Sequence, residues 1–183
     1  MSIPSLERRA FFNWRFVKTE RRKGNKRWAA LLVLSIPLFF FFHRYVMGAG
    51  LISDISMLPT LTGGRYFLIN KYLYHLTRPK RGEIVVLRRS KRERWYYVKR
   101  VIGLEGETVA IASGRVWING KVLEEPYTLG PTFPTMEPFR VEKNHYFLLG
   151  DNRSFSEDSR TFGSVPAEQI EGKINPKGGF PLK

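Results

Sequence analysis

The chain has 183 residues, 43% of them hydrophobic, which is enough for one domain of ordinary size with its own core. Its 31 Lys and Arg residues outnumber its 16 Asp and Glu residues, so the net charge is +15. Such an excess predicts an anionic partner, either nucleic acid or the anionic face of a membrane. Disulfides, thiolate metal sites and a cysteine nucleophile are excluded because the chain has no cysteine.

The N-terminal segment concentrates much of the charge. Residues 1–27 hold nine Lys and Arg against Glu7 and Glu20, which leaves +7, and they are predicted to form a basic cytoplasmic tail. Residues 28–42 then carry no charge, and continuing to Met47 makes a stretch of twenty. Because twenty helical residues span about 30 Å, we expect one transmembrane helix over residues 28–47, kinked at Pro37.

Three other structures would fit this apolar segment less well. A buried core helix should show a polar face, whereas the four phenylalanines at 39–42 make the helix apolar on every side. The small residues at 48–50 resemble the cleavage site of an export signal, but the basic region is long for one. We therefore favour an uncleaved anchor over a cleaved signal or an interfacial helix. The positive-inside rule then places residues 48–183 on the side opposite the tail.

Residues 48–183 are predicted to form a mostly β domain with little helix. Asn119-Gly120 supplies the two residues that a type I′ hairpin turn needs, a second hairpin is expected across residues 88–94, and the Pro-rich residues 129–139 are expected to form a loop or an extended excursion. Strand-sized alternating segments bounded by Gly, Pro, Asn or Ser cover residues 65–74, 82–89, 94–102, 107–113, 115–120, 121–125 and 145–151.

Ser56 and Lys99 are the candidates for catalysis. A serine is a weak nucleophile until a base takes its proton, and the three histidines lack the aspartate partner and local motif of a triad. Lys99 lies in the aromatic and β-branched stretch "WYYVKRVIG", where burial would lower its pKa and leave a neutral amine. Taken alone, a serine in the context of Ser56 is most often a cap or loop serine, and a lysine in the context of Lys99 is more often a solvated strand residue.

Four segments in order resemble the successive boxes of type I signal peptidases, membrane-anchored serine proteases that remove signal peptides. They are "SMLPTL", "RYFLINKYLY" with "RPKRGEIVV", "VKRVIGLEGE" and "LLGDNRSFSEDSRTFGSVP", and they span roughly residues 52–172. The resemblance implies a signal-peptidase-like antiparallel β catalytic domain (48–183) behind one N-terminal transmembrane helix. It implies signal peptides of preproteins and the lipid bilayer as partners, with no cofactor, no metal, no nucleic acid and no obligate protein partner.

The resemblance also assigns roles to individual residues. Ser56 falls on the nucleophile of the family and Lys99 on its general base. Ser156 matches the serine that hydrogen-bonds the lysine, and Asp158 and Arg160 match a structural acid and base pair beside the site. Residues 150–153 would form the turn that delivers this segment, an architectural role.

Asp54 departs from the pattern of the family. Some members have a serine two positions before the nucleophile, and its hydroxyl helps to stabilise the oxyanion of the tetrahedral intermediate. An ionised carboxylate offers only acceptors and would repel that charge. Three alternatives follow: Asp54 points away, it is protonated, or the second donor comes from elsewhere.

The resemblance further implies cleavage after small residues, typically alanine, at the minus-one and minus-three positions of the substrate. The substrate is expected to add a strand beside that of Lys99. The side chains expected to line the pockets, each of which could also be an ordinary core residue, are Ile52, Met57, Val86 and Val98.

Other classes remain open at this point. A nucleic-acid-binding β domain lacks support because the aromatic RNA-binding motifs are absent. An inactive membrane-tethered scaffold of the same fold is a second alternative, and soluble self-cleaving repressors also pair serine with lysine. Relatives in mitochondria, thylakoids or conjugation systems share the boxes. We expect a single-pass endopeptidase of the inner (plasma) membrane, with its catalytic domain on the outer or periplasmic side.

Overall fold

The computed structural model describes residues 26–45, 47–90, 92, 95–178 and 180–181. The chain divides into two compact units, residues 1–37 and 38–183. Of the expected basic tail, residues 1–25 lie outside the described residues.

Helix α1 (Lys26–Tyr45) corresponds to the apolar segment and contains Pro37. It begins and ends two residues earlier than the helix expected over residues 28–47, since Met47 already belongs to the first strand. Among the described residues, no helix combines the length and the apolar character needed to cross a membrane.

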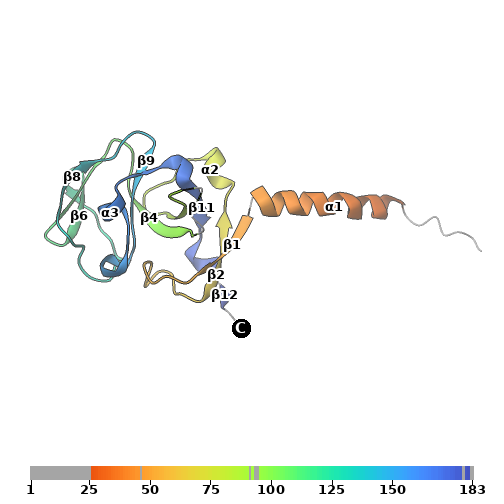
Figure 1. Ribbon diagram of the computed structural model, residues 1–183, viewed down its shortest axis with the longest axis horizontal. Helices are drawn as coiled ribbons and strands as arrows, with labels where there is room; N and C mark the ends of the chain where they lie inside the picture. Colours follow the sequence, from red (N-terminus) through yellow and green to blue (C-terminus); the bar gives the residue numbers. More distant parts are fainter. Residues whose placement is uncertain (1–25, 46, 91, 93–94, 179, 182–183) are drawn as a thin grey trace, which may run out of the picture. The chain divides into compact units, whose positions relative to one another are not determined.

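In the part of the chain that the structure describes, the larger of two sheets has eight strands, and every pair in it is antiparallel. Most of its strands are labelled in Figure 1. Its order is β1-β2-β11-β3-β4-β9-β10, and β12 pairs with β2. The strands are β1 (Met47–Ile52), β2 (Arg65–Asn70), β3 (Ile84–Leu87), β4 (Tyr97–Gly103), β9 (His145–Leu149), β10 (Val165–Pro166), β11 (Ile170–Ile174) and β12 (Phe180–Pro181).

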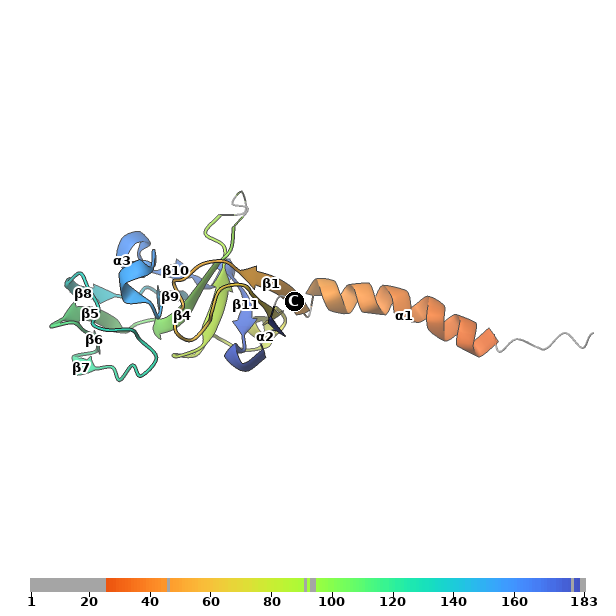
Figure 2. The ribbon, with the colours of Figure 1, turned by 90° about the horizontal axis from the view of Figure 1, so that it is seen from below.

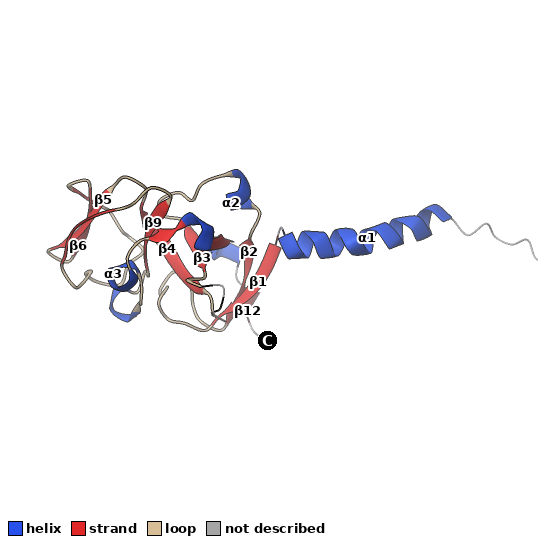
Figure 3. Ribbon diagram, turned by 45° about the horizontal axis from the view of Figure 1, so that its top comes forward, coloured by secondary structure: helices blue, strands red, loops and turns tan. Residues whose placement is uncertain are grey.

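The smaller sheet has the order β7-β6-β5-β8 and lies beyond β9, away from β1 and β2 (Figures 1 and 2). Its strands are β5 (Thr108–Ala112), β6 (Arg115–Ile118), β7 (Lys121–Val122) and β8 (Met136–Arg140). The helices after residue 47 are single turns at the margins of the sheets (Figure 3). They are α2 (Leu73–Leu76), α3 (Ser159–Phe162), η1 (Arg153–Phe155), η2 (Ala167–Gln169) and η3 (Pro176–Gly178). The expected mostly antiparallel β fold is confirmed.

Within the described residues, the core consists of three apolar clusters, and strand β3 separates two of them. Successive side chains of a strand point to opposite faces. Ile84 and Val86 accordingly join a cluster with Met57, while Val85 and Leu87 join another on the opposite face. The third cluster packs β5 and β6 of the smaller sheet against β4 and β9 of the larger one. Strands β3 and β4 are thus buried on both faces.

The turn predictions hold in part. Asn119 and Gly120 have φ values of 50° and 77°, which is the conformation that a type I′ turn requires. Strands β3 and β4 pair antiparallel on either side of residues 88–94, where a second hairpin was expected. Residues 91, 93 and 94 of that segment lie outside the described residues.

Two predictions of secondary structure were wrong. Part of the Pro-rich stretch forms β8, because Pro138 lies on an edge strand where one missing N–H is tolerated. The strand expected over residues 65–74 ends at Asn70. Helix α2 begins at Leu73, and the Leu73 N–H donates a hydrogen bond to the Asn70 side-chain oxygen.

Candidate active site

Ser56 lies in the turn that follows β1, and its position is fixed from two sides. Its backbone carbonyl accepts a hydrogen bond from the Asn152 N–H at 2.9 Å, and the Asn152 side chain donates to the Ile55 carbonyl at 3.2 Å. On the other side, the Leu61 N–H closes the turn onto the Met57 carbonyl. The Ser56 residue is 2% exposed. The turn therefore presents a buried, backbone-anchored hydroxyl.

Lys99 reaches this hydroxyl from β4. Its Nζ lies 2.7 Å from Ser56 Oγ, which is hydrogen-bonding distance. Strand β4 lies inside the larger sheet, between β3 and β9, and the Lys99 side chain is buried, with 1% exposed. The structure thus brings together the two residues that the sequence analysis put forward, 43 positions apart in the chain.

Burial lowers the pKa of Lys99, because removal from water disfavours the charged amine. The carboxylates of Asp54, Asp158 and Glu157 act in the opposite direction, and Arg160 lowers the pKa further. The net effect is a pKa below that of a free lysine. A lysine of this kind can be neutral and accept a proton at a pH where an exposed lysine cannot.

Asp54 points toward the lysine. Its Oδ1 accepts a hydrogen bond from the Ile55 N–H at 2.7 Å, and its Oδ2 lies 3.9 Å from Lys99 Nζ. Its side chain is otherwise open to solvent, with 64% exposed. The carboxylate of Asp54 therefore lies beside the lysine at the edge of the site.

The expected hydrogen bond between Ser156 and Lys99 is absent, which corrects the role taken from the resemblance. Among the described residues, Ser156 Oγ is a buried side-chain atom without a hydrogen-bond partner. The hydroxyl is turned onto Gly150, since a Cβ built at Gly150 would lie 2.2 Å from Ser156 Oγ and 2.6 Å from the Ser56 carbonyl oxygen. The absence of a side chain at Gly150 is what allows Ser156 and Ser56 to approach this closely.

Asp158 and Arg160 form the ion pair that was expected beside the site. Arg160 Nε and Nη2 each donate to the fully buried Asp158 carboxylate at 2.8 Å. Asp158 Oδ2 also accepts the Gly150 N–H at 3.0 Å, and Arg160 donates to the carbonyls of Ser156 and Phe133. The pair therefore ties the start of α3 to Gly150.

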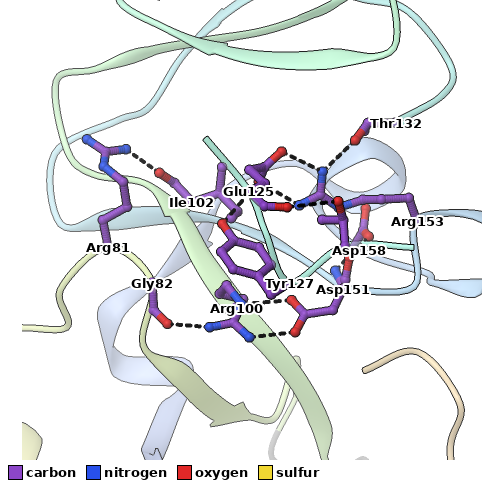
Figure 4. A network of polar contacts seen from close by, with 12 residues as sticks. Arg81, Gly82, Arg100, Ile102, Glu125, Tyr127, Thr132, Asp151, Arg153 and Asp158 are labelled. Atoms are coloured by element: carbon purple, nitrogen blue, oxygen red, sulfur yellow. Dashed lines mark hydrogen bonds and ion pairs between the residues drawn. The ribbon is translucent and has the colours of Figure 1, made fainter. Parts of the chain in front are cut away.

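Two further buried ion pairs hold residues 150–153 in place, and sequence reasoning did not find their partners (Figure 4). Arg100 donates through Nε and Nη2 to Asp151 at 2.7 and 2.5 Å. Arg153 donates to Glu125 through Nη1 and Nη2 at 2.9 and 2.6 Å. The architectural role expected for this turn agrees with these contacts. Glu125 carried no signal in the sequence because its contact with Arg153 spans 28 residues.

A cleft of about 390 Å³ opens beside Ser56. Strand β1 and the residues up to Asp54 form one wall, while Trp95 and Tyr96 stand exposed at another. All four side chains that were expected to line the substrate pockets line this cleft, namely Ile52, Met57, Val86 and Val98. The nucleophile candidate therefore faces a mostly apolar recess.

Comparisons with known proteins point in one direction. Residues 25–177 match the family described as signal peptidase, peptidase S26. The chain is 38% identical over 147 residues to a signal peptidase I of Leptolyngbya laminosa, covering 76% of this chain and 72% of the relative. It is 36% identical over 174 residues to a signal peptidase I of Bacillus caldolyticus, covering 85% and 91%.

A solved structure is also similar. The crystal structure of a signal peptidase I from Enterococcus faecalis is 33% identical to the chain, with a TM-score of 0.45. The match covers 54% of this chain and 98% of that one.

Proposed function

Because the chain belongs to the signal peptidase family, peptidase S26, and is a serine endopeptidase of the signal peptidase I type, we propose that Ser56 is its nucleophile and Lys99 its general base. The observation that carries the proposal is the distance of 2.7 Å between Lys99 Nζ and Ser56 Oγ, with both residues buried. Burial of this kind is what gives a lysine the lowered pKa of a base.

Acylation comes first in the proposed reaction. Neutral Lys99 accepts the proton of Ser56 as Oγ attacks the scissile carbonyl carbon, which leaves a negatively charged tetrahedral intermediate and an ammonium group. The ammonium then returns its proton to the leaving amine, the new N-terminus of the mature protein. The signal peptide stays attached to Ser56 as an ester.

Deacylation follows by the same chemistry with water in place of the amine. Lys99, neutral again, takes a proton from a water molecule, and the resulting hydroxide attacks the ester carbonyl. The second tetrahedral intermediate collapses, Ser56 recovers its proton from the ammonium, and the signal peptide leaves with a free carboxylate. The Ser56 backbone N–H is the proposed donor to the oxyanion in both halves.

For substrate choice, we propose cleavage after small residues in the pattern Ala-X-Ala. The recess lined by Met57, Val86 and Val98 supports this, since it lies beside Ser56 and is apolar. Strand addition by the substrate has support from the pairing of β4. Strand β9 pairs only with Arg100–Gly103, so on that side the described strands leave residues 97–99 unpaired.

For location, we propose attachment to the inner membrane through α1, with the N-terminus in the cytoplasm and the site on the outer side. The support is the basic segment before α1 and the apolar side chains of the helix at residues 28–41, which are exposed. Extraction of membranes with alkaline carbonate tests the attachment: the protein should stay with the membrane pellet. Release into the supernatant would contradict it.

The function itself is tested with detergent-purified protein and a preprotein whose signal ends in Ala-X-Ala. The wild type should cut once, after the second alanine, and its rate should fall as the pH drops and Lys99 becomes protonated. Lys99→Ala should not cut, whereas the exposed control Lys121→Ala should cut like the wild type. A wild type that does not cut would favour the inactive scaffold, and a Lys99→Ala variant that cuts would mean that Lys99 is not the general base.

A further inference from the structure

Asp54 is a charged residue of the site to which the proposed mechanism gives no role. It stands two positions before Ser56, lines the same cleft, and places Oδ2 3.9 Å from Lys99 Nζ. The hydrogen bond from the Ile55 N–H occupies only Oδ1. The second oxygen is thus the part of Asp54 that faces the lysine.

The other charged groups that act on Lys99 are already paired. Asp158 is bonded to Arg160 at 2.8 Å, and Glu157 is bonded to Arg89 at 3.0 Å. Among the described ion pairs, Lys99 is the one cation within 4.0 Å of Asp54. Of the three carboxylates that act on the lysine, Asp54 is therefore the one that is not paired with an arginine among the described ion pairs.

Resting on the proposed function, we propose that Asp54 is a positioning residue that holds and stabilises the Lys99 ammonium formed when Ser56 gives up its proton. Attack of Oγ on the scissile carbonyl, with proton transfer to the lysine, turns three neutral groups, the carbonyl, the serine hydroxyl and the lysine amine, into a tetrahedral oxyanion and an ammonium. A carboxylate 3.9 Å from the ammonium attracts the new positive charge but had no charge to attract before. The interaction therefore stabilises the transition state more than the ground state.

The same geometry means that Asp54 affects how the rate of cleavage depends on pH. Its negative charge favours the protonated lysine, so it raises the pKa of Lys99 against the larger lowering by burial. Removing the charge should shift the acid limb of the rate profile to lower pH. It should also lower the plateau above that limb, because the ammonium in the transition state loses its partner. A purely structural role for Asp54 could lower the plateau but would leave the acid limb where it is.

The test compares pH profiles of kcat/KM for preprotein cleavage by the wild type, Asp54→Asn, Asp54→Glu and the control Glu137→Gln. Asparagine keeps an oxygen for the Ile55 N–H, so the turn is preserved, which matching thermal melts would confirm. We expect Asp54→Asn to lower the plateau about threefold to tenfold, a modest loss because Asp54 is largely exposed. Its acid limb should lie at lower pH. Asp54→Glu should recover part of the plateau and part of the shift of the acid limb. Glu137 is an exposed carboxylate on β8, so Glu137→Gln should match the wild type.

Each result separates this proposal from the proposed function. If the wild type cuts and Ser56→Ala does not, but Asp54→Asn keeps the wild-type limb and plateau, the role of Asp54 is wrong while the Ser56–Lys99 mechanism stands. A faster Asp54→Asn plateau would also overturn it, because the carboxylate would then act mainly by repelling the oxyanion. If Ser56→Ala cuts like the wild type, the proposed function fails first.

Discussion

Lys99 and Arg100 are neighbours on β4, and the fold treats these two buried cations in opposite ways. Arg100 is paired with the fully buried Asp151 through two hydrogen bonds and donates to the Gly82 carbonyl as well (Figure 4). Its guanidinium also lies 3.9 Å from the centre of the Tyr127 ring. Among the described residues, the Ser56 hydroxyl is the one hydrogen-bonding partner of the Lys99 amine, and the nearest carboxylate is that of the exposed Asp54 at 3.9 Å.

The difference shows two solutions to the burial of a positive charge. Arginine keeps its proton under all ordinary conditions, so a buried arginine requires a partner of opposite charge. Lysine can lose its proton instead, and the pKa of Lys99 is lowered because the effect of burial is larger than the opposing effect of the Asp54 carboxylate. One residue therefore serves the architecture of the 150–153 turn, and its neighbour is left free to act as a base.

The sharpest way to break this comparison is to remove either partner of the Ser56–Lys99 contact. Ser56→Ala and Lys99→Met should each lower kcat for preprotein cleavage by about 10⁴-fold or more, because nucleophile and base act as a unit. Methionine fills most of the space of lysine, so the fold should survive, as circular dichroism can check. Substantial residual cleavage by either variant would mean that another residue is the nucleophile or base.

Breaking the ion pair between Arg100 and Asp151 should lower the stability of the fold. Asp151→Asn removes the charge that compensates Arg100, and we expect the free energy of unfolding to fall by about 3 kcal/mol. Denaturant titration measures the loss. In the double variant Arg100→Met with Asp151→Leu, most of the stability should return, because no unpaired charge remains. If Asp151→Asn unfolds at the wild-type denaturant concentration, Arg100 does not depend on Asp151.

Gly150 lies against both Ser56 and Ser156, so a side chain at this position should displace the nucleophile. Gly150→Ala places a Cβ within 2.6 Å of the Ser56 carbonyl oxygen, so the nucleophile must move, and we expect kcat/KM to fall about 100-fold. The matched control is Gly63→Ala, where the new Cβ would meet its nearest atom at an ordinary 3.7 Å. Equal activity of the two variants would show that the approach of Ser156 and Ser56 to Gly150 is not needed for catalysis.

The smallest expected effect is a gain in stability when the base is removed. Lys99→Met should raise the free energy of unfolding by about 1 kcal/mol at low pH, because a buried ammonium costs free energy that a methionine does not. The pKa of Lys99 is lower in the folded chain, so the unfolded chain holds more protons between the two pKa values. Wild-type stability should therefore rise with pH across that window.

The gain from Lys99→Met should accordingly be full below the folded pKa of Lys99. It should shrink as the pH rises toward ~10.4, the value of a free lysine. Denaturant midpoints of the two proteins at a series of pH values give the comparison. A difference that does not change with pH would indicate that Lys99 titrates alike in the folded and unfolded chains.

The sequence predicted the elements that depend on neighbouring residues and missed those that depend on the tertiary fold. Strands β5 and β6 and the turn at Asn119-Gly120 are local features, set by alternation and by two residues that tolerate positive φ, and they were predicted. Strand β8 was not, because the tolerance for Pro138 depends on its place at a sheet edge. That place is fixed by the rest of the fold.

The site shows the same division. The contact between Ser56 and Lys99 was expected because each lies in a recognisable motif, and the ion pair of Asp158 and Arg160 is nearly local. The orientation of Ser156 depends on the packing of one hydroxyl against Gly150, which no sequence pattern encodes. The partners Asp151 for Arg100 and Glu125 for Arg153 likewise come from the tertiary fold.

The most direct test of the central claim is a titration of Lys99 itself. NMR spectra of the detergent-purified protein with labelled lysines, assigned by the missing signal of Lys99→Met, would follow each lysine side chain as the pH changes. We predict that Lys99 titrates below the ~10.4 of a free lysine, because its amine is buried. A Lys99 that titrates at or above that value would be charged at neutral pH and could not be the base.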